Sequence, residues 1–351
     1  FIINKLKNKE INMKNITKIG LSALAGSMAM ASAHAGDLSL TGSMEVTYTV
    51  GSGYQNDGNN LGQENEMTVS ASTELDNGVG VAYKRSLTAV QAGSDSELVF
   101  SNMPMIGGTL AMTSTGSPIS AIDDVTPTAF EEANAQVGSI DDVNGMDGTF
   151  GIRYTLADIA GSGFTLDAMY TPVHGSGDTT ADQGVSGTSG IEGNGDGVEI
   201  ALKGSVPMIE GLSLGVGYAN LEEEVQAATA VSQGDVDQEE GTGYVTYAYG
   251  PLTVGYQVGA VNIATTNTLN KTHYMGVSYQ VTDDLSVSYN QIDAAQTSTT
   301  GVRTEQDMDS ISIGYSMGGM TISVADADCS NCAFTSGRSI DETTISLAVA
   351  F

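Results

Sequence analysis

Apolar residues occupy every second position along most of this chain, and this alternation constrains the fold more than any other feature. In the first such segment Met44, Val46 and Tyr48 fall on one face, while Glu45 and Thr47 fall on the other. A repeat of two residues is typical of a β-strand with one apolar and one polar face. Helical periodicity is almost absent, so the chain is predicted to be all-β.

The alternation predicts sixteen strands, an even number. Their ranges are 37–50, 64–75, 79–87, 97–102, 108–115, 149–157, 163–171, 198–206, 211–220, 243–249, 251–261, 272–281, 285–292, 308–317, 319–326 and 341–351. Tight turns such as Asp76-Asn77-Gly78 follow the even strands, and longer polar loops follow the odd ones. This regularity predicts an up-and-down antiparallel sheet, and no linker divides it into two domains.

A soluble sandwich would also alternate, so the two faces must be compared. Charged side chains such as Lys84 and Glu66 fall on the polar face, and Arg85 is the clear exception. A charge that faces lipid at mid-depth costs about 2–4 kcal/mol, which selects against outward charges. The polar faces are rich in Ser, Thr, Gly, Ala and Gln, as expected for the wall of a water-filled lumen.

Outward aromatic residues gather at the two ends of the strands. Those at the long-loop end are Tyr48, Tyr83, Tyr170, Tyr218 and Tyr289, and those at the short-turn end are Tyr249, Tyr279, Tyr315 and Phe351. Amphipathic rings are stabilised at the two interfaces of a bilayer. Closure of the sheet also removes the edges that hydrocarbon would not tolerate. We therefore expect a transmembrane β-barrel of sixteen strands.

The composition excludes several other classes. The chain has 351 residues with 42 acidic and 12 basic side chains, a net charge of -30, and its pI is near 4.1. Such acidity argues against a nucleic-acid partner, which requires a basic surface. A hydrophobic content of 40% is too high for a disordered chain.

The amino terminus has the pattern of an export signal. From Met13, Lys14 and Lys18 precede a short apolar run over 19–30, and Ala33-His34-Ala35 has the form of a cleavage site. We expect residues 1–12 to be an upstream or non-native segment, 13–35 a secretory signal peptide and 36–351 the barrel. Removing residues 1–35 takes away 5 Lys and 1 Glu, which leaves 7 basic and 41 acidic residues and a charge of -34.

Both ends of the mature chain resemble those of a known family. The opening Gly36-Asp37-Leu38-Ser39-Leu40 and the final segment 345–351 are similar to the sixteen-stranded general-diffusion porins of Gram-negative outer membranes, particularly the alphaproteobacterial type. The resemblance implies a homotrimer in the cell outer membrane that conducts small polar solutes and ions by passive diffusion. It also implies contacts with outer-membrane lipid and lipopolysaccharide, and folding by the barrel-assembly machinery. The expected assembly signal is Ile345, Leu347, Val349 and Phe351.

The third loop, Gly116 to Gly148, is the longest connection and has no Lys or Arg. Its acidic residues are Asp123, Asp124, Glu131, Glu132, Asp141, Asp142 and Asp147. Thr126-Pro127 and the capping-box spacing of Thr128 predict a short helix near 127–134. The residues alone leave open whether this loop lies on the cell surface or in the barrel, and the resemblance implies that it folds inward and constricts the pore.

Three basic residues, Lys84, Arg153 and Lys203, are expected on the lumenal wall. In the resembled family a basic cluster on the wall faces the acidic loop, and here that cluster is sparse. Each cation could instead neutralise a nearby acid such as Glu66, Glu199 or Asp167. Because charged rings select the sign of permeant ions, the acidic excess predicts a preference for cations.

Cys329 and Cys332 lie in the last long loop. Their C-x-x-C spacing would suit redox chemistry or half of a zinc site, but no second pair accompanies them, and an exported chain favours a disulfide. Acidic runs such as Asp326-Ala327-Asp328 could bind Ca²⁺, although none has EF-hand spacing and a solvated surface is expected instead. No other cofactor is expected, and the identity of any metal is left unknown.

Three other functions compete with the diffusion channel. Catalysis has little support, because the mature chain has only His174 and His273. A substrate-specific porin would need a row of inward aromatics, and parity gives only Tyr244 and Tyr274. A non-conducting structural or adhesive barrel would have a lumen plugged by side chains, whereas the lumenal residues here are small.

Overall fold

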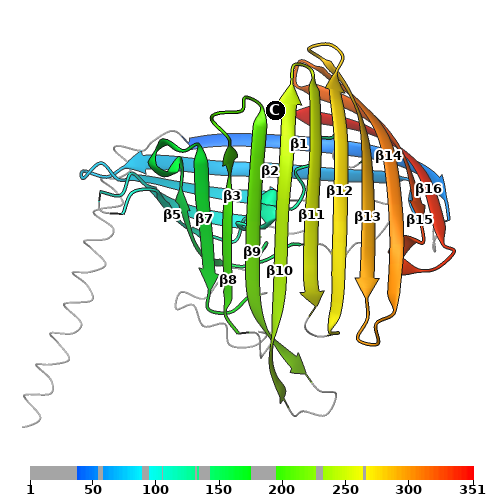
Figure 1. Cartoon of the computed structure of the whole chain (residues 1–351). Coiled ribbons are helices and arrows are strands. Elements are labelled where there is room, and N and C mark those ends of the chain that lie inside the picture. The colour runs from blue at the N-terminus through cyan, green and yellow to red at the C-terminus, as the bar shows by residue number, and fades with distance from the viewer. Residues whose placement is uncertain are drawn as a thin grey trace, which may run out of the picture.

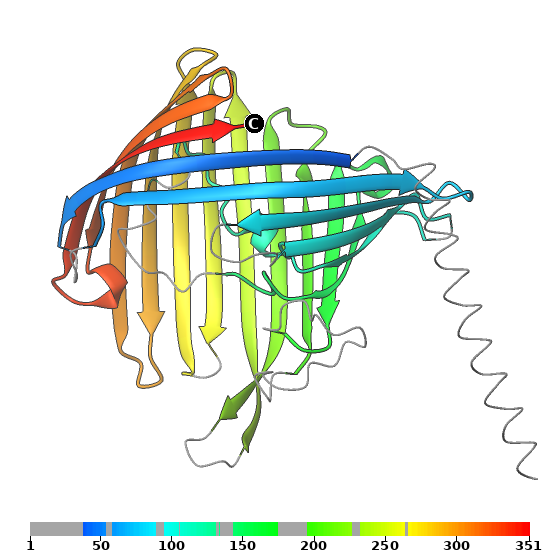
Figure 2. The same ribbon diagram turned by 180° about the vertical axis from the view of Figure 1, so that it is seen from behind.

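The computed structural model describes residues 38–53, 58–88, 95–104, 106–130, 133, 143–174, 195–226, 232–263 and 266–351. Sixteen antiparallel strands form one closed barrel, in which each strand pairs with its neighbours in sequence and β1 pairs with β16 (Figures 1 and 2). The predicted sixteen-stranded up-and-down barrel is confirmed. The expected leader over residues 1–35 lies outside the described ranges.

Every predicted strand has its counterpart. The strands are β1 Leu38–Ser52, β2 Leu61–Glu74, β3 Gly80–Thr88, β4 Asp95–Ser101, β5 Thr109–Thr113, β6 Gly151–Leu156, β7 Phe164–Thr171, β8 Gly197–Ser205, β9 Leu212–Gln226, β10 Ser232–Tyr249, β11 Leu252–Ile263, β12 Thr268–Gln280, β13 Leu285–Thr297, β14 Arg303–Met317, β15 Met320–Ser330 and β16 Ser339–Ala350. No helix in the described part of the chain is long and apolar enough to span a bilayer.

Several strands of the second half extend beyond their predicted ends. β10 begins at Ser232, not at residue 243, and β14 begins at Arg303, not at residue 308. The predicted loop 293–307 therefore shrinks to 298–302, and most of the predicted loop 221–242 belongs to β9, which ends at Gln226, and to β10. The ladder continues while its outward positions become acidic, for example where Asp293 lies opposite Asp307. Acids at these positions interrupt the apolar alternation on which the prediction depended.

The two faces of each strand are as different as the alternation predicts. On β14, Ser310 and Ser312 are 2% and 1% exposed, whereas Ile311 and Ile313 are 60% and 45% exposed. Cross-strand pairing joins inward residues to inward residues, so the polar face is continuous around the inside of the barrel. The tyrosines and Phe351 of both predicted aromatic rows are exposed on the outside.

The turns and the seam close the barrel. Gly318 and Gly319 join β14 to β15 with φ values of +57° and +86°, a conformation that favours glycine. At the seam, Phe351 N–H donates to the Gly42 carbonyl oxygen at 2.9 Å, and Gly42 N–H donates to the Phe351 oxygen at 2.8 Å. Ile345, Leu347 and Val349 point outward on β16. Their role as an assembly signal stays a prediction.

Candidate functional site: the lumen and its inward loops

The third loop, bounded by β5 and β6 as residues 114–150, runs along the inner wall of the barrel. Its backbone N–H groups donate to inward side chains on four distant strands. These hydrogen bonds join Ile119 to Glu199 Oε2 on β8 (3.2 Å), Asn144 to Glu240 Oε2 on β10 (2.9 Å), Val125 to Gln257 Oε1 on β11 (3.1 Å) and Ala129 to Ser288 Oγ on β13 (2.9 Å). The described part of the loop thus follows the inner wall from β8 to β13.

Two buried carboxylates fix the beginning and the end of this loop. Glu199 is 0% exposed and accepts hydrogen bonds from the N–H groups of Ile119 and Met146, so one side chain binds both legs of the loop. Glu240, also buried, accepts from Asn144 and from Gly145, the latter at 2.7 Å. A buried carboxylate is stable only with such donors, so its position and that of the loop depend on each other.

Glycines on the inner wall let the middle of the loop approach closely. A Cβ on Gly276 would lie 2.8 Å from the Pro127 carbonyl oxygen, and one on Gly314 would lie 2.5 Å from the Ala129 carbonyl oxygen. Asn290 Nδ2 donates to the same Pro127 oxygen at 3.0 Å. Because these two strand positions have no side chain, the loop backbone lies directly against the inner wall.

The predicted helix over 127–134 is wrong for residues 127–130, which are not helical. The Pro127 carbonyl and the Ala129 N–H are bonded to the wall and are not available to a helical turn. A 3₁₀ turn, η2, forms earlier in the loop, at Ser120–Ile122, and within the predicted range Ala133 N–H donates to the Phe130 carbonyl oxygen at 3.2 Å. Glu131, Glu132, Asp141 and Asp142 lie outside the described residues.

The other three predicted loop acids form one electrostatic group. Asp123 is half-buried, whereas Asp124 and Asp147 are exposed. Burial, followed by the repulsion of the Asp124 carboxylate, raises the pKa of Asp123 to about 7, and Asp147 adds to the effect. Asp123 therefore changes its charge near neutral pH.

The three wall cations lie on different strands and differ in their surroundings. Arg153 on β6 pairs with the buried Asp167 on β7, with Arg153 Nε 2.9 Å from Asp167 Oδ1. Arg153 thus neutralises a wall acid, as the alternative interpretation held. Lys84 on β3 is exposed and lies opposite Glu97, and Lys203 on β8 is half-buried.

Water reaches the inner wall on the side of β1 to β4, where the described inward side chains other than the buried Ser86 are exposed or half-buried. Glu45 and Glu64 lie directly opposite each other there, and Glu66 follows on β2. The prediction from sequence named Glu45 and Glu66 but missed Glu64 and Glu97. Glu64 could have been predicted, because residues two apart on a strand lie on the same face and Glu66 was already assigned to the lumen. The roles of Glu240 and Gln257 could not, because they depend on contacts with the third loop, which is distant in sequence.

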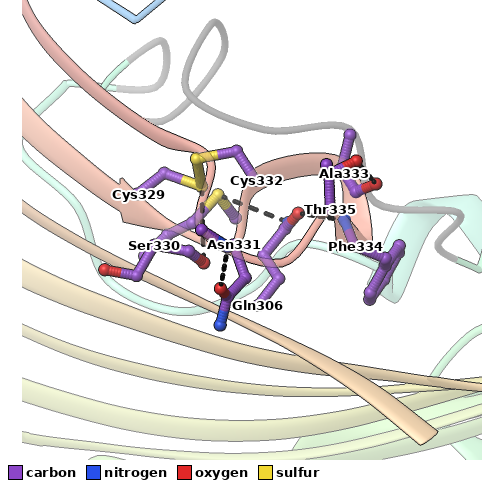
Figure 3. The surroundings of a disulfide bond; sticks show 10 residues. Gln306, Cys329, Ser330, Asn331, Cys332, Ala333, Phe334 and Thr335 are labelled. Carbon is purple, nitrogen blue, oxygen red and sulfur yellow. Dashed lines mark hydrogen bonds between the residues drawn. A yellow bond between two sulfur atoms is a disulfide. The ribbon is translucent and has the colours of Figure 1, made fainter.

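No group of three potential metal ligands occurs among the residues that the structure describes. The two histidines make short polar contacts: His174 Nε2 lies 2.7 Å from the Glu222 carbonyl oxygen, and His273 Nδ1 lies 2.7 Å from the Tyr256 hydroxyl. Cys329 and Cys332 are joined by a disulfide, with their Cα atoms 5.7 Å apart (Figure 3).

A comparison of the sequence with models of known protein families agrees with the barrel, its inward third loop and its acidic lumen. A family model described as Gram-negative porin matches residues 20–328. The chain belongs to the Gram-negative porin family. It is accordingly an outer-membrane channel protein with the porin fold. No curated protein sequence matches it significantly.

Solved porin structures share this fold at low identity. OmpT of Vibrio cholerae, in a trimer form, is 11% identical with a TM-score of 0.63, over 90% of this porin and 100% of OmpT. The complex of Salmonella typhi OmpF with daunomycin gives 11% and 0.62, with coverage of 90% and 97%. An anion-selective porin from Comamonas acidovorans gives 14% and 0.60, with coverage of 90% and 99%.

Proposed function

We propose that this porin forms a water-filled channel for the passive diffusion of small hydrophilic solutes and ions, with a preference for cations. The supporting observation is the charge of the inward side chains that water reaches. The carboxylates among them include Glu45, Glu64, Glu66, Glu74, Glu97, Asp123, Asp124 and Asp147. The cations of the wall are Lys84, Lys203 and Arg153, the last already paired with Asp167, and the half-buried Arg338 lies in the loop between β15 and β16.

The third loop is the constriction in this proposal. Its described part covers the inner wall from β8 to β13, so a permeating ion passes between the loop and the open side lined by β1 to β4. Asp124 and Asp147 are exposed on the loop, and Glu66 and Glu97 lie on the inward faces of β2 and β4. A narrow aqueous path between acidic surfaces raises the local concentration of cations.

General diffusion is favoured over a sugar-specific pathway by the environment of the inward aromatics. Tyr274 is buried. Tyr244 is half-buried and packs over Gly215, where a Cβ would lie 2.4 Å from the ring. Neither ring is free on both faces to stack on a passing sugar.

The proposed setting is a homotrimer in the outer membrane, surrounded by lipid and lipopolysaccharide and inserted by the barrel-assembly machinery after cleavage of the leader. The trimer form of the similar OmpT supports this state. The narrower alphaproteobacterial assignment belongs to the same proposal. Light scattering of the detergent-solubilised protein tests the oligomer, since a monomeric mass would contradict it.

The ion preference is tested by reversal potentials across a planar bilayer with a salt gradient. We expect the potential of a cation-selective pore at neutral pH, and a smaller potential in Asp124→Asn/Asp147→Asn. Asp76→Asn is the matched control, because Asp76 is an exposed acid in the short β2–β3 turn. A reversal potential of the opposite sign would overturn the cation preference without affecting the assignment as a channel.

A further inference from the structure

The eighth loop, residues 331–338 between β15 and β16, packs against the inner wall of the barrel. Cys332 is 0% exposed and belongs to a buried apolar cluster with Ile292 and Met308. Phe334 N–H donates to Gln306 Oε1 at 3.4 Å (Figure 3). Met308 and Gln306 are inward residues of β14, so the loop lies over the lumenal face and not outside the rim.

The backbone of this loop is strained, and several bonds hold it in place. Asn331, Ala333 and Phe334 have φ values of +54°, +51° and +54°, a left-handed conformation that Asn tolerates and that is unfavourable for Ala and Phe. Cys332 N–H donates to the Arg338 carbonyl oxygen at 3.1 Å, and Gly337 N–H donates to Asn331 Oδ1 at 2.9 Å. Strain kept in place by surrounding bonds is typical of functional segments.

The eighth loop lies at a different depth from the third loop. On β15, Ala325 packs in a cluster with Phe130 of the third loop, whereas Cys329 packs in the cluster of the eighth loop. These two positions are four residues apart on one strand, or about 13 Å. A solute that enters from the long-loop end therefore meets the eighth loop first.

We propose that the eighth loop is a second, outer filter in series with the third loop, and that the Cys329–Cys332 disulfide holds it over the lumen. The filter acts by size on hydrophilic solutes, since the loop narrows the entrance above the β12–β16 wall. This role rests on the chain being a channel and is independent of cation preference.

Thiol labelling of Thr335→Cys tests the position of the loop. Thr335 is exposed in the eighth loop, and both native cysteines are bonded to each other, so the new thiol is the one that reacts. Its thiolate attacks the sulfenyl sulfur of a bulky methanethiosulfonate, which forms a mixed disulfide and releases the sulfinate. We expect a stepwise loss of single-channel conductance and slower swelling of liposomes in large sugars. Thr300→Cys, an exposed threonine in the 298–302 loop, is the matched control and should lose nothing.

Removing the disulfide tests what holds the filter. In Cys329→Ser/Cys332→Ser we expect higher conductance and faster entry of large sugars, with an unchanged reversal potential. Unchanged conductance of Thr335→Cys after complete labelling, verified by mass spectrometry, would overturn the outer filter. An unchanged size limit in the double serine variant would overturn the clamping role of the disulfide. A changed reversal potential in the double serine variant would overturn a filter that acts by size alone.

Discussion

Carboxylates have two distinct uses in this lumen, and burial separates them. Glu199 and Glu240 are buried and accept backbone hydrogen bonds, so they position the third loop. Asp124 and Asp147 are exposed on that loop and face water. Both kinds contribute to the same acidic composition, yet only the second is exposed to the water through which a cation permeates. Substitutions at the two kinds should therefore have different effects on the channel.

Glu199→Ala should loosen the third loop. It orphans the N–H groups of Ile119 and Met146, at a cost of about 1–3 kcal/mol for each buried amide left without a partner. We expect more frequent conductance fluctuations in single-channel records, and a smaller effect for Glu199→Gln, which keeps one acceptor oxygen. Glu74→Ala is the control, because Glu74 is an exposed acid near the turn end of β2. Equal noise in both alanine variants would contradict a positioning role for Glu199.

The charge of Asp123 should make selectivity depend on pH. Its pKa is raised to about 7, so ionisation opposes burial: packing of the loop is favoured below that pH and weakens as pH rises through it. Over the same interval the loop gains a negative charge, so the ratio of K⁺ to Cl⁻ permeability should rise between about pH 6 and about pH 8. Asp123→Asn should flatten this rise and Asp76→Asn should not. A flat profile in the unsubstituted protein would exclude Asp123 as the titrating group.

At the scale of elements, the strands were predictable and the loops were not. The alternation around Ile311 and Ile313 places β14 directly, because one face meets lipid and the other meets water. The start of β14 was missed, since Asp307 and Asp309 are outward and acidic beyond the apolar zone. The polar sequence of the eighth loop gives no sign that Cys332 lies inside the barrel, because that burial depends on β14, which is distant in sequence.

At the scale of elements, the wall glycines beneath the third loop, Gly276 and Gly314, allow a direct test by substitution. Gly314→Val would place a Cβ 2.5 Å from the Ala129 carbonyl oxygen, so the third loop must move away from the wall and into the aqueous path. We expect a lower single-channel conductance. In the control, Gly243→Val, the nearest atom lies 3.6 Å from the new Cβ, and conductance should be kept. If Gly314→Val folds and conducts normally, the loop does not limit the current.

For the molecule as a whole, the lumen has two unlike sides. The wall from β8 to β15 is covered by the third and eighth loops, and many of its inward side chains are buried. The wall from β1 to β4 remains accessible to water and carries Glu45, Glu64 and Glu66. The aqueous path is thus displaced toward the acidic side, so a modest number of carboxylates can dominate the field that an ion meets.

Selectivity that arises from this field should weaken with salt. The Debye length falls from about 10 Å at 0.1 M to about 3 Å at 1 M, and the wall carboxylates act on ions across a water-filled path. We expect the ratio of K⁺ to Cl⁻ permeability to fall steeply over that range, while the flux of a small neutral sugar stays constant. Lys84→Ala should raise the ratio at low salt, because Lys84 is an exposed cation on the water-accessible wall, and this gain should vanish at 1 M. A ratio that is independent of salt would mean that ions are selected by direct contact at the constriction, and not by the charge of the wall.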